Sequence, residues 1–85
     1  MSAAHLAAME EGFREAGFAN VRARNGDEYG QMIVKGDCPC GLGTSCCSVT
    51  GDLYRNMAAA YLKHHVKRMG LAHIEEDKAE GRWTP

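Results

Sequence analysis

The chain has 85 residues, a formal charge of −1 and four cysteines. This length fits one domain with a marginal core, since a domain of this size buries only ~60–65% of its unfolded surface. The balanced charge argues against a strongly basic nucleic-acid-binding protein. No apolar run approaches the ~20 residues of a membrane span, and the sequence has no signal-peptide pattern, so we expect a cytoplasmic protein.

The first predicted element is a helix over residues 3–16. Ser2 is a suitable N-cap because its hydroxyl accepts a hydrogen bond from an early backbone N–H, and Gly17 is a natural C-terminal stop. Gly12 weakens the middle of this helix, because glycine has low helix propensity. Apolar residues recur at helical spacing, at Leu6, Met9, Phe13 and Ala16.

A β-hairpin is expected next. Residues 18–24 and 28–35 contain strand-forming residues, and Asn25 and Gly26 between them tolerate the positive φ of a tight turn. A cysteine-containing loop follows, and residues 48–50 fit a short third strand.

A long second helix is predicted from about Leu53 to Met69, with Gly70 as its stop. Residues 71–85 carry many charges, and we expect them to form either a packed extension or a mobile tail after a domain that spans residues 1–70. The predicted order is α-β-β-(β)-α, and the predicted fold class is a small single α+β domain. The expected buried stripe of the second helix comprises Leu53, Met57, Ala58, Tyr61, Leu62, Val66 and Met69.

The cysteines are the most specific feature of the chain. All four lie within ten residues, at Cys38, Cys40, Cys46 and Cys47. Thiolate is a good zinc ligand, and structural zinc usually takes four ligands in a tetrahedron. A reducing compartment also favours metal binding over disulfides. The cluster therefore predicts a zinc knuckle in which these four side chains are the ligands.

This segment resembles the SEC-C motif, and the resemblance covers residues 37–47 only. The matching residues are Asp37-Cys38-Pro39-Cys40-Gly41-Leu42-Gly43 followed by Cys46-Cys47. The SEC-C motif is a small zinc-binding motif found at the carboxy terminus of the bacterial preprotein-translocase ATPase and in many other bacterial proteins. The resemblance implies Cys38 and Cys40 as the first ligand pair and Cys46 and Cys47 as the second, with a shorter loop between the pairs than in the family. The resemblance implies a metal site and does not extend to the fold of the whole chain.

The sequence leaves open which side chains bind a metal and whether the cysteines bind one at all. Adjacent residues in a strand point to opposite faces, so Cys46 and Cys47 both reach one ion only if the chain turns there. Otherwise a histidine of the second helix, His64 or His65, completes the site with the first cysteine pair and one cysteine of the second. Free thiols, disulfides across the loop and an iron–sulfur cluster are the remaining alternatives.

The other polar residues are less specific. Five basic residues could form a phosphate-binding face, but we favour the interpretation that they belong to a solvated polar face. We expect His73 at the surface, and Asp77 is one of several acids in the C-terminal segment. The five basic residues are Arg22, Arg24, Lys63, Lys67 and Arg68.

No catalytic constellation emerges from the sequence. It contains no nucleophile elbow and no phosphate-cradling loop, and a zinc ion saturated by thiolates has no open coordination position. The sequence therefore predicts a non-enzymatic zinc-binding adaptor or regulatory module that recognises a protein partner. The alternatives are a nucleic-acid-binding zinc finger and a thiol redox or metal-buffering protein.

Overall fold

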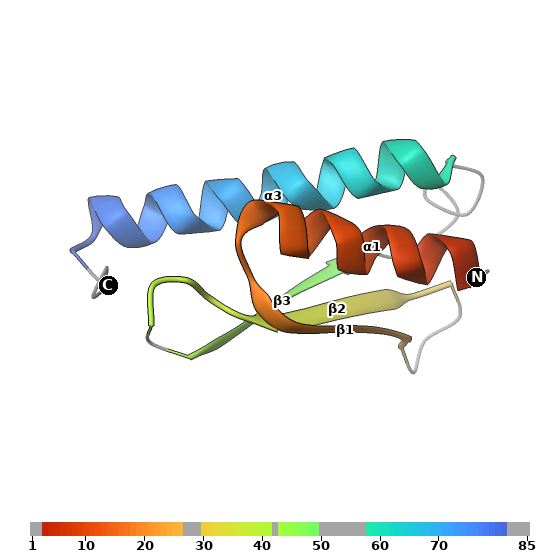
Figure 1. Ribbon diagram of the computed structural model, residues 1–85, viewed down its shortest axis with the longest axis horizontal. Helices are drawn as coiled ribbons and strands as arrows, with labels where there is room; N and C mark the ends of the chain where they lie inside the picture. Colours follow the sequence, from red (N-terminus) through yellow and green to blue (C-terminus); the bar gives the residue numbers. More distant parts are fainter. Residues whose placement is uncertain (1–2, 27–29, 42, 50–57, 82–85) are drawn as a thin grey trace.

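The structure, a computed structural model, describes residues 3–26, 30–41, 43–49 and 58–81. The strands form an antiparallel sheet in the order β1-β2-β3, and both helices lie on one face of it (Figure 1). The predicted α+β class and the predicted order of elements are confirmed. The elements in these ranges are α1 (Ala3–Ala16), β1 (Ala19–Asn25), β2 (Met32–Asp37), β3 (Thr44–Val49) and α3 (Ala59–Ala79).

Helix α1 ends where the sequence predicts. Gly17 has a φ of +111°, and the N–H of Phe18 donates to the carbonyl of Phe13 at 3.1 Å. A glycine in the left-handed region permits this hydrogen bond, which reaches back over the last turn of the helix. The chain then enters β1, and the rings of Phe13 and Phe18 stack with their centroids 4.1 Å apart.

The strands differ in length from the prediction. Asn25 pairs with Met32, and the N–H of Gly26 donates to the carbonyl of Gln31 at 2.9 Å, so the connection is longer than a two-residue turn. Residues 27–29 lie outside the described chain. Strand β3 begins at Thr44 and pairs with β2 throughout, so it is longer than the expected strand at residues 48–50. Thr50 also lies outside the described chain.

The prediction that the second helix stops at Gly70 is wrong. Helix α3 passes through Gly70 and continues to Ala79, while the expected start at residues 53–57 lies outside the described chain. A Cβ atom at Gly70 would lie 3.0 Å from the Cβ of Ala16 and 3.1 Å from the ring of Phe18. Gly70 therefore allows close packing of α3 on α1 and does not end the helix.

The core lies between the helices and the sheet. Of the stripe predicted for the second helix, Leu62 and Val66 are fully buried, whereas Tyr61 and Met69 are 55% and 50% exposed. Neither described helix has the combination of length and apolar character needed to cross a membrane. The largest side chains with less than 2% exposure are Phe13, Met9, Met32, Leu62, Val34 and Val66.

The two helices run in the same direction (Figure 1) and lie close together at Gly12. A Cβ atom there would lie 2.6 Å from the carbonyl oxygen of Lys63. Near the same crossing, Glu15 makes ion pairs with Lys63 at 3.1 Å and with Lys67 at 3.4 Å. This crossing positions α3 so that its C-terminal half extends beyond α1 toward the β2–β3 connection (Figure 1).

Candidate metal centre

Three metal-binding side chains converge where the β2–β3 connection meets α3. Cys38 and Cys40 lie in the turn after β2, and Asp77 lies near the C-terminal end of α3. Their sulfur and oxygen donor atoms all lie within 4.8 Å of one another, and all three residues are buried. Among the residues that the structure describes, this is the one such group of histidine, cysteine and acidic side chains. Two segments far apart in the sequence thus form one candidate site.

The turn after β2 folds around the Cys38 sulfur. The N–H of Gly41 donates to the carbonyl of Cys38 at 3.1 Å, and the N–H of Cys38 donates to the carbonyl of Gly43 at 2.9 Å. The N–H of Cys40 points at the Cys38 sulfur at 3.4 Å. Gly41 has a φ of +82°, which a residue with a side chain rarely adopts. Hydrogen bonds of this kind to a ligand atom orient it and tune its metal affinity.

Cys38 and Asp77 are in direct contact. The thiol of Cys38 donates to Oδ2 of Asp77 at 3.3 Å. Burial, together with side-chain hydrogen bonds to Cys40 and Asp77, raises the pKa of the Cys38 thiol to about 11, while the hydrogen bond from the Cys40 N–H acts in the opposite direction. The thiol therefore keeps its proton at neutral pH when no metal is bound. A metal cation must replace this proton, because the thiolate and not the thiol is the ligand.

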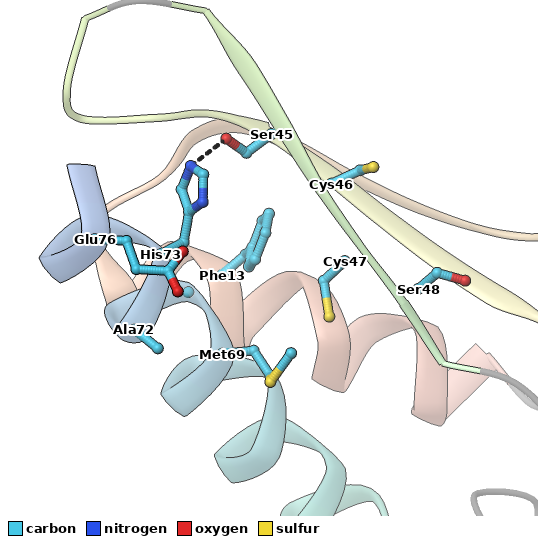
Figure 2. A pocket seen from close by; sticks show the side chains of 10 residues that line it. Phe13, Ser45, Cys46, Cys47, Ser48, Met69, Ala72, His73 and Glu76 are labelled. Atoms are coloured by element: carbon cyan, nitrogen blue, oxygen red, sulfur yellow. Dashed lines mark hydrogen bonds between the residues drawn. The ribbon is translucent and has the colours of Figure 1, made fainter. Parts of the chain in front are cut away.

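A histidine lies beside these three donors. Nε2 of His73 lies 3.3 Å from Oδ2 of Asp77. The same nitrogen lies 2.9 Å from the hydroxyl oxygen of Ser45 (Figure 2). The His73 side chain is 39% exposed, so the centre opens toward solvent on this side. A cavity of about 240 Å³ contains the whole arrangement. Its lining residues are Cys38, Cys40, Gly43, Thr44, Ser45, His73 and Asp77.

The second cysteine pair does not join the first. Cys46 and Cys47 both lie on β3, where they pair with Lys35 and Val34 of β2. Because the strand stays extended through both residues, Cys46 is exposed on the outer face and Cys47 is buried and points toward the helices (Figure 2). The structure therefore does not assemble the expected four-cysteine ligand set, and none of the four cysteines forms a disulfide.

The two histidines considered as substitute ligands also lie apart from the centre. His64 is exposed and His65 is half-buried, both in the first half of α3. His65 precedes Asp77 by twelve residues, which corresponds to about 18 Å along a helix. Neither histidine belongs to the described group of metal-binding side chains.

The basic residues considered for phosphate binding are divided between two sides of the molecule. Arg22 and Arg24 are exposed on β1, on the sheet face opposite the helices, because they alternate with buried positions. The other three lie on α3, where Lys63 and Lys67 pair with Glu15 and hold the pKa of that carboxyl below its usual value. The five residues therefore do not share one face.

Sequence reasoning missed Asp77 and His73. Their spacing of four residues places both on one side of a helix, a pattern that commonly brings two ligands together. The signal is visible only if the helix continues past Gly70, because residues 73 and 77 otherwise fall in a charged extension.

The two cysteines of β3 should differ in reactivity. We expect iodoacetamide at neutral pH to modify Cys46 much faster than Cys47 in the folded protein. Cys46 is exposed, whereas Cys47 is buried, and this burial raises its pKa, with a smaller contribution from the neighbouring Cys46. Timed alkylation followed by peptide mass spectrometry measures both rates, and the denatured protein is the control. Equal rates in the folded protein would contradict the placement of Cys47.

Comparison with protein-family models, curated proteins and solved structures finds no match to this chain. The interpretation of the centre therefore depends on its own geometry. Two thiols, a carboxylate and a nearby imidazole fit Zn²⁺, which binds cysteine, histidine and acidic ligands and has no geometric preference that these donors would violate.

Proposed function

We propose that this protein is a small, non-enzymatic zinc-binding module in which the metal ion fastens the β2–β3 turn to the C-terminal half of α3. The observation that carries the proposal is the convergence of three buried side chains, Cys38, Cys40 and Asp77, whose donor atoms all lie within 4.8 Å of one another. The proposal retains the first ligand pair implied by the SEC-C resemblance and replaces the second pair with a residue of α3.

The position of the centre suits a structural role. Cys38 and Asp77 are 39 residues apart in the sequence, so a shared metal ion closes a long loop. Beyond Gly70, Ile74 is the buried apolar residue of the described part of α3, and the helix there extends beyond α1 (Figure 1). A metal ion would therefore fix the end of α3, whose other contacts with the sheet are sparse.

We place the surface for a protein partner in a groove next to the metal centre. The groove has a volume of about 300 Å³ and lies between β3 and α3 (Figure 2). Met69 lines it and is half exposed, and β3 is an edge strand of the described sheet. Ser45 and His73 line both the groove and the metal cavity, so the metal ion would also stabilise one wall of the groove. An extended segment with apolar side chains is the kind of partner that fits an edge strand beside an apolar wall.

The proposed location is the cytoplasm. Thiols remain reduced there and can serve as metal ligands, whereas an oxidising compartment favours disulfides.

Native mass spectrometry tests the proposal directly. We expect one zinc ion per chain in protein produced with zinc, loss of that ion on chelation, and no bound zinc in the Cys38→Ser variant. Cys46→Ser is the matched control, because this exposed cysteine lies away from the centre and its replacement should leave the zinc in place. Metal-free wild-type protein would contradict the proposal. Several metal ions per chain would favour the metal-buffering alternative.

A further inference from the structure

We infer that His73 is the fourth zinc ligand and closes a tetrahedral Cys38–Cys40–Asp77–His73 centre. This inference rests on the proposed function and extends it, because it decides whether the bound ion has an open position. A three-ligand zinc site keeps a position for water or substrate, whereas four protein ligands produce a closed structural site.

The distances around Asp77 match those between ligands of a single zinc ion. With Zn–N and Zn–O bonds of about 2.1 Å and Zn–S bonds of about 2.3 Å, a tetrahedral ion separates nitrogen and oxygen ligands by about 3.4 Å and sulfur and oxygen ligands by about 3.6 Å. Oδ2 of Asp77 lies 3.3 Å from Nε2 of His73 and 3.3 Å from Sγ of Cys38. Two of the six edges of the tetrahedron are therefore within a few tenths of an ångström of their required length. His73 lies outside the group whose donor atoms are all within 4.8 Å of one another, so its ring must shift toward the sulfur atoms to complete the site.

The cavity offers no better fourth ligand among its described lining residues. Besides the three converging donors, the polar side-chain groups that line the cavity are the hydroxyls of Thr44 and Ser45 and the imidazole of His73. Neutral hydroxyls are uncommon zinc ligands, whereas imidazole is a common one. His73 also lies one helical turn before Asp77, so the backbone of α3 holds both side chains on the same side.

Metal binding would change one contact between β3 and α3. Nε2 of His73 is the ring atom that contacts Ser45, and a nitrogen bound to zinc has no proton to donate and no lone pair to offer. The neutral ring then carries its proton on Nδ1, and the hydroxyl of Ser45 is released into the groove between β3 and α3. Zinc occupancy would therefore alter the wall that the metal cavity shares with the proposed partner groove.

Cobalt titration separates a ligand from a residue that only supports the ligands. Metal-free protein is titrated with Co²⁺, whose absorption reports tetrahedral coordination, and Zn²⁺ competition gives the affinity. We expect His73→Ala to weaken zinc binding by more than 100-fold, because the loss of supporting residues typically costs about 10–100-fold. Ser45→Ala should change the affinity by less than about 10-fold, since Ser45 is not a ligand in the closed site. His64→Ala, an exposed histidine on the same helix, should have no effect.

A second measurement needs no variant and therefore does not depend on the folding of one. In wild-type protein with ¹⁵N-labelled histidine and bound ¹¹³Cd²⁺, we expect scalar coupling between cadmium and Nε2 of His73. Absence of this coupling, or a His73→Ala variant that binds zinc as tightly as wild type, would overturn the inference while the proposed function stands. Failure of the wild-type protein to bind any Co²⁺, Zn²⁺ or Cd²⁺ would overturn both.

Discussion

Exhaustive chelation is expected to lower the melting temperature of this protein by more than about 20 °C. Structural zinc in small domains contributes about 10 kcal/mol of binding free energy, and 1 kcal/mol corresponds to roughly 4–8 °C in a domain of 60–100 residues. The proposed centre would take the place of apolar packing at the end of α3, where Ile74 is the main buried apolar residue. Loss of the ion should therefore loosen the β2–β3 turn and residues 71–79 first.

Calorimetry before and after chelation measures this effect, and hydrogen exchange localises it. A Cys38→Ser/Cys40→Ser variant should melt near the temperature of the chelated wild type, and chelation should not lower that temperature further. Cys46→Ser should melt like the zinc-bound wild type, because Cys46 is exposed on β3. Full retention of the melting temperature in protein shown to contain no metal would rule out a structural zinc ion.

Replacement of Gly12 by alanine should destabilise the protein by about 2–3 kcal/mol, the cost typical of an overpacked contact. Helix propensity alone predicts the opposite sign, because alanine is more favourable than glycine by about 1 kcal/mol inside a helix. The added Cβ would lie 2.6 Å from the carbonyl oxygen of Lys63 and 3.2 Å from the backbone nitrogen of Lys67. Backbone atoms cannot rotate away as a side chain can, so α1 and α3 must separate.

Denaturant unfolding at equilibrium measures the change in free energy. Gly70→Ala is the matched comparison, because its Cβ would meet the side chains of Ala16 and Phe18 at 3.0 and 3.1 Å instead of backbone at 2.6 Å. We expect Gly70→Ala to destabilise the protein less than Gly12→Ala does. A Gly12→Ala variant that is more stable than wild type would contradict the close helix crossing.

Local sequence signals predicted much of the fold. The stop at Gly17 depends on the conformational freedom of one residue, and the span of α1 depends on helical spacing over a few turns. Short-range sequence spacing also explains why Cys38 and Cys40 could be predicted to lie close together. Cys38 and Cys40 are two residues apart in a glycine-containing turn, so their proximity needs no tertiary contact.

The same local rules failed at Gly70 and at the second cysteine pair. Glycine ends many helices, but at Gly70 the contact with Ala16 and Phe18 requires a residue without a side chain, and α3 continues. Cys46 and Cys47 match a ligand pair in sequence, but pairing with β2 keeps them extended and directs them to opposite faces.

The sequence by itself determined the α+β class, the first helix and the pair of thiols around which a metal centre can form. Only the tertiary structure decided that Asp77 joins Cys38 and Cys40 and that His73 lies beside Asp77, because the crossing of α3 over α1 at Gly12 brings the C-terminal half of α3 to the β2–β3 turn. That crossing depends on close approach between residues more than fifty positions apart in the chain. Spacing rules cover neighbours in sequence, whereas a metal centre depends on neighbours in space.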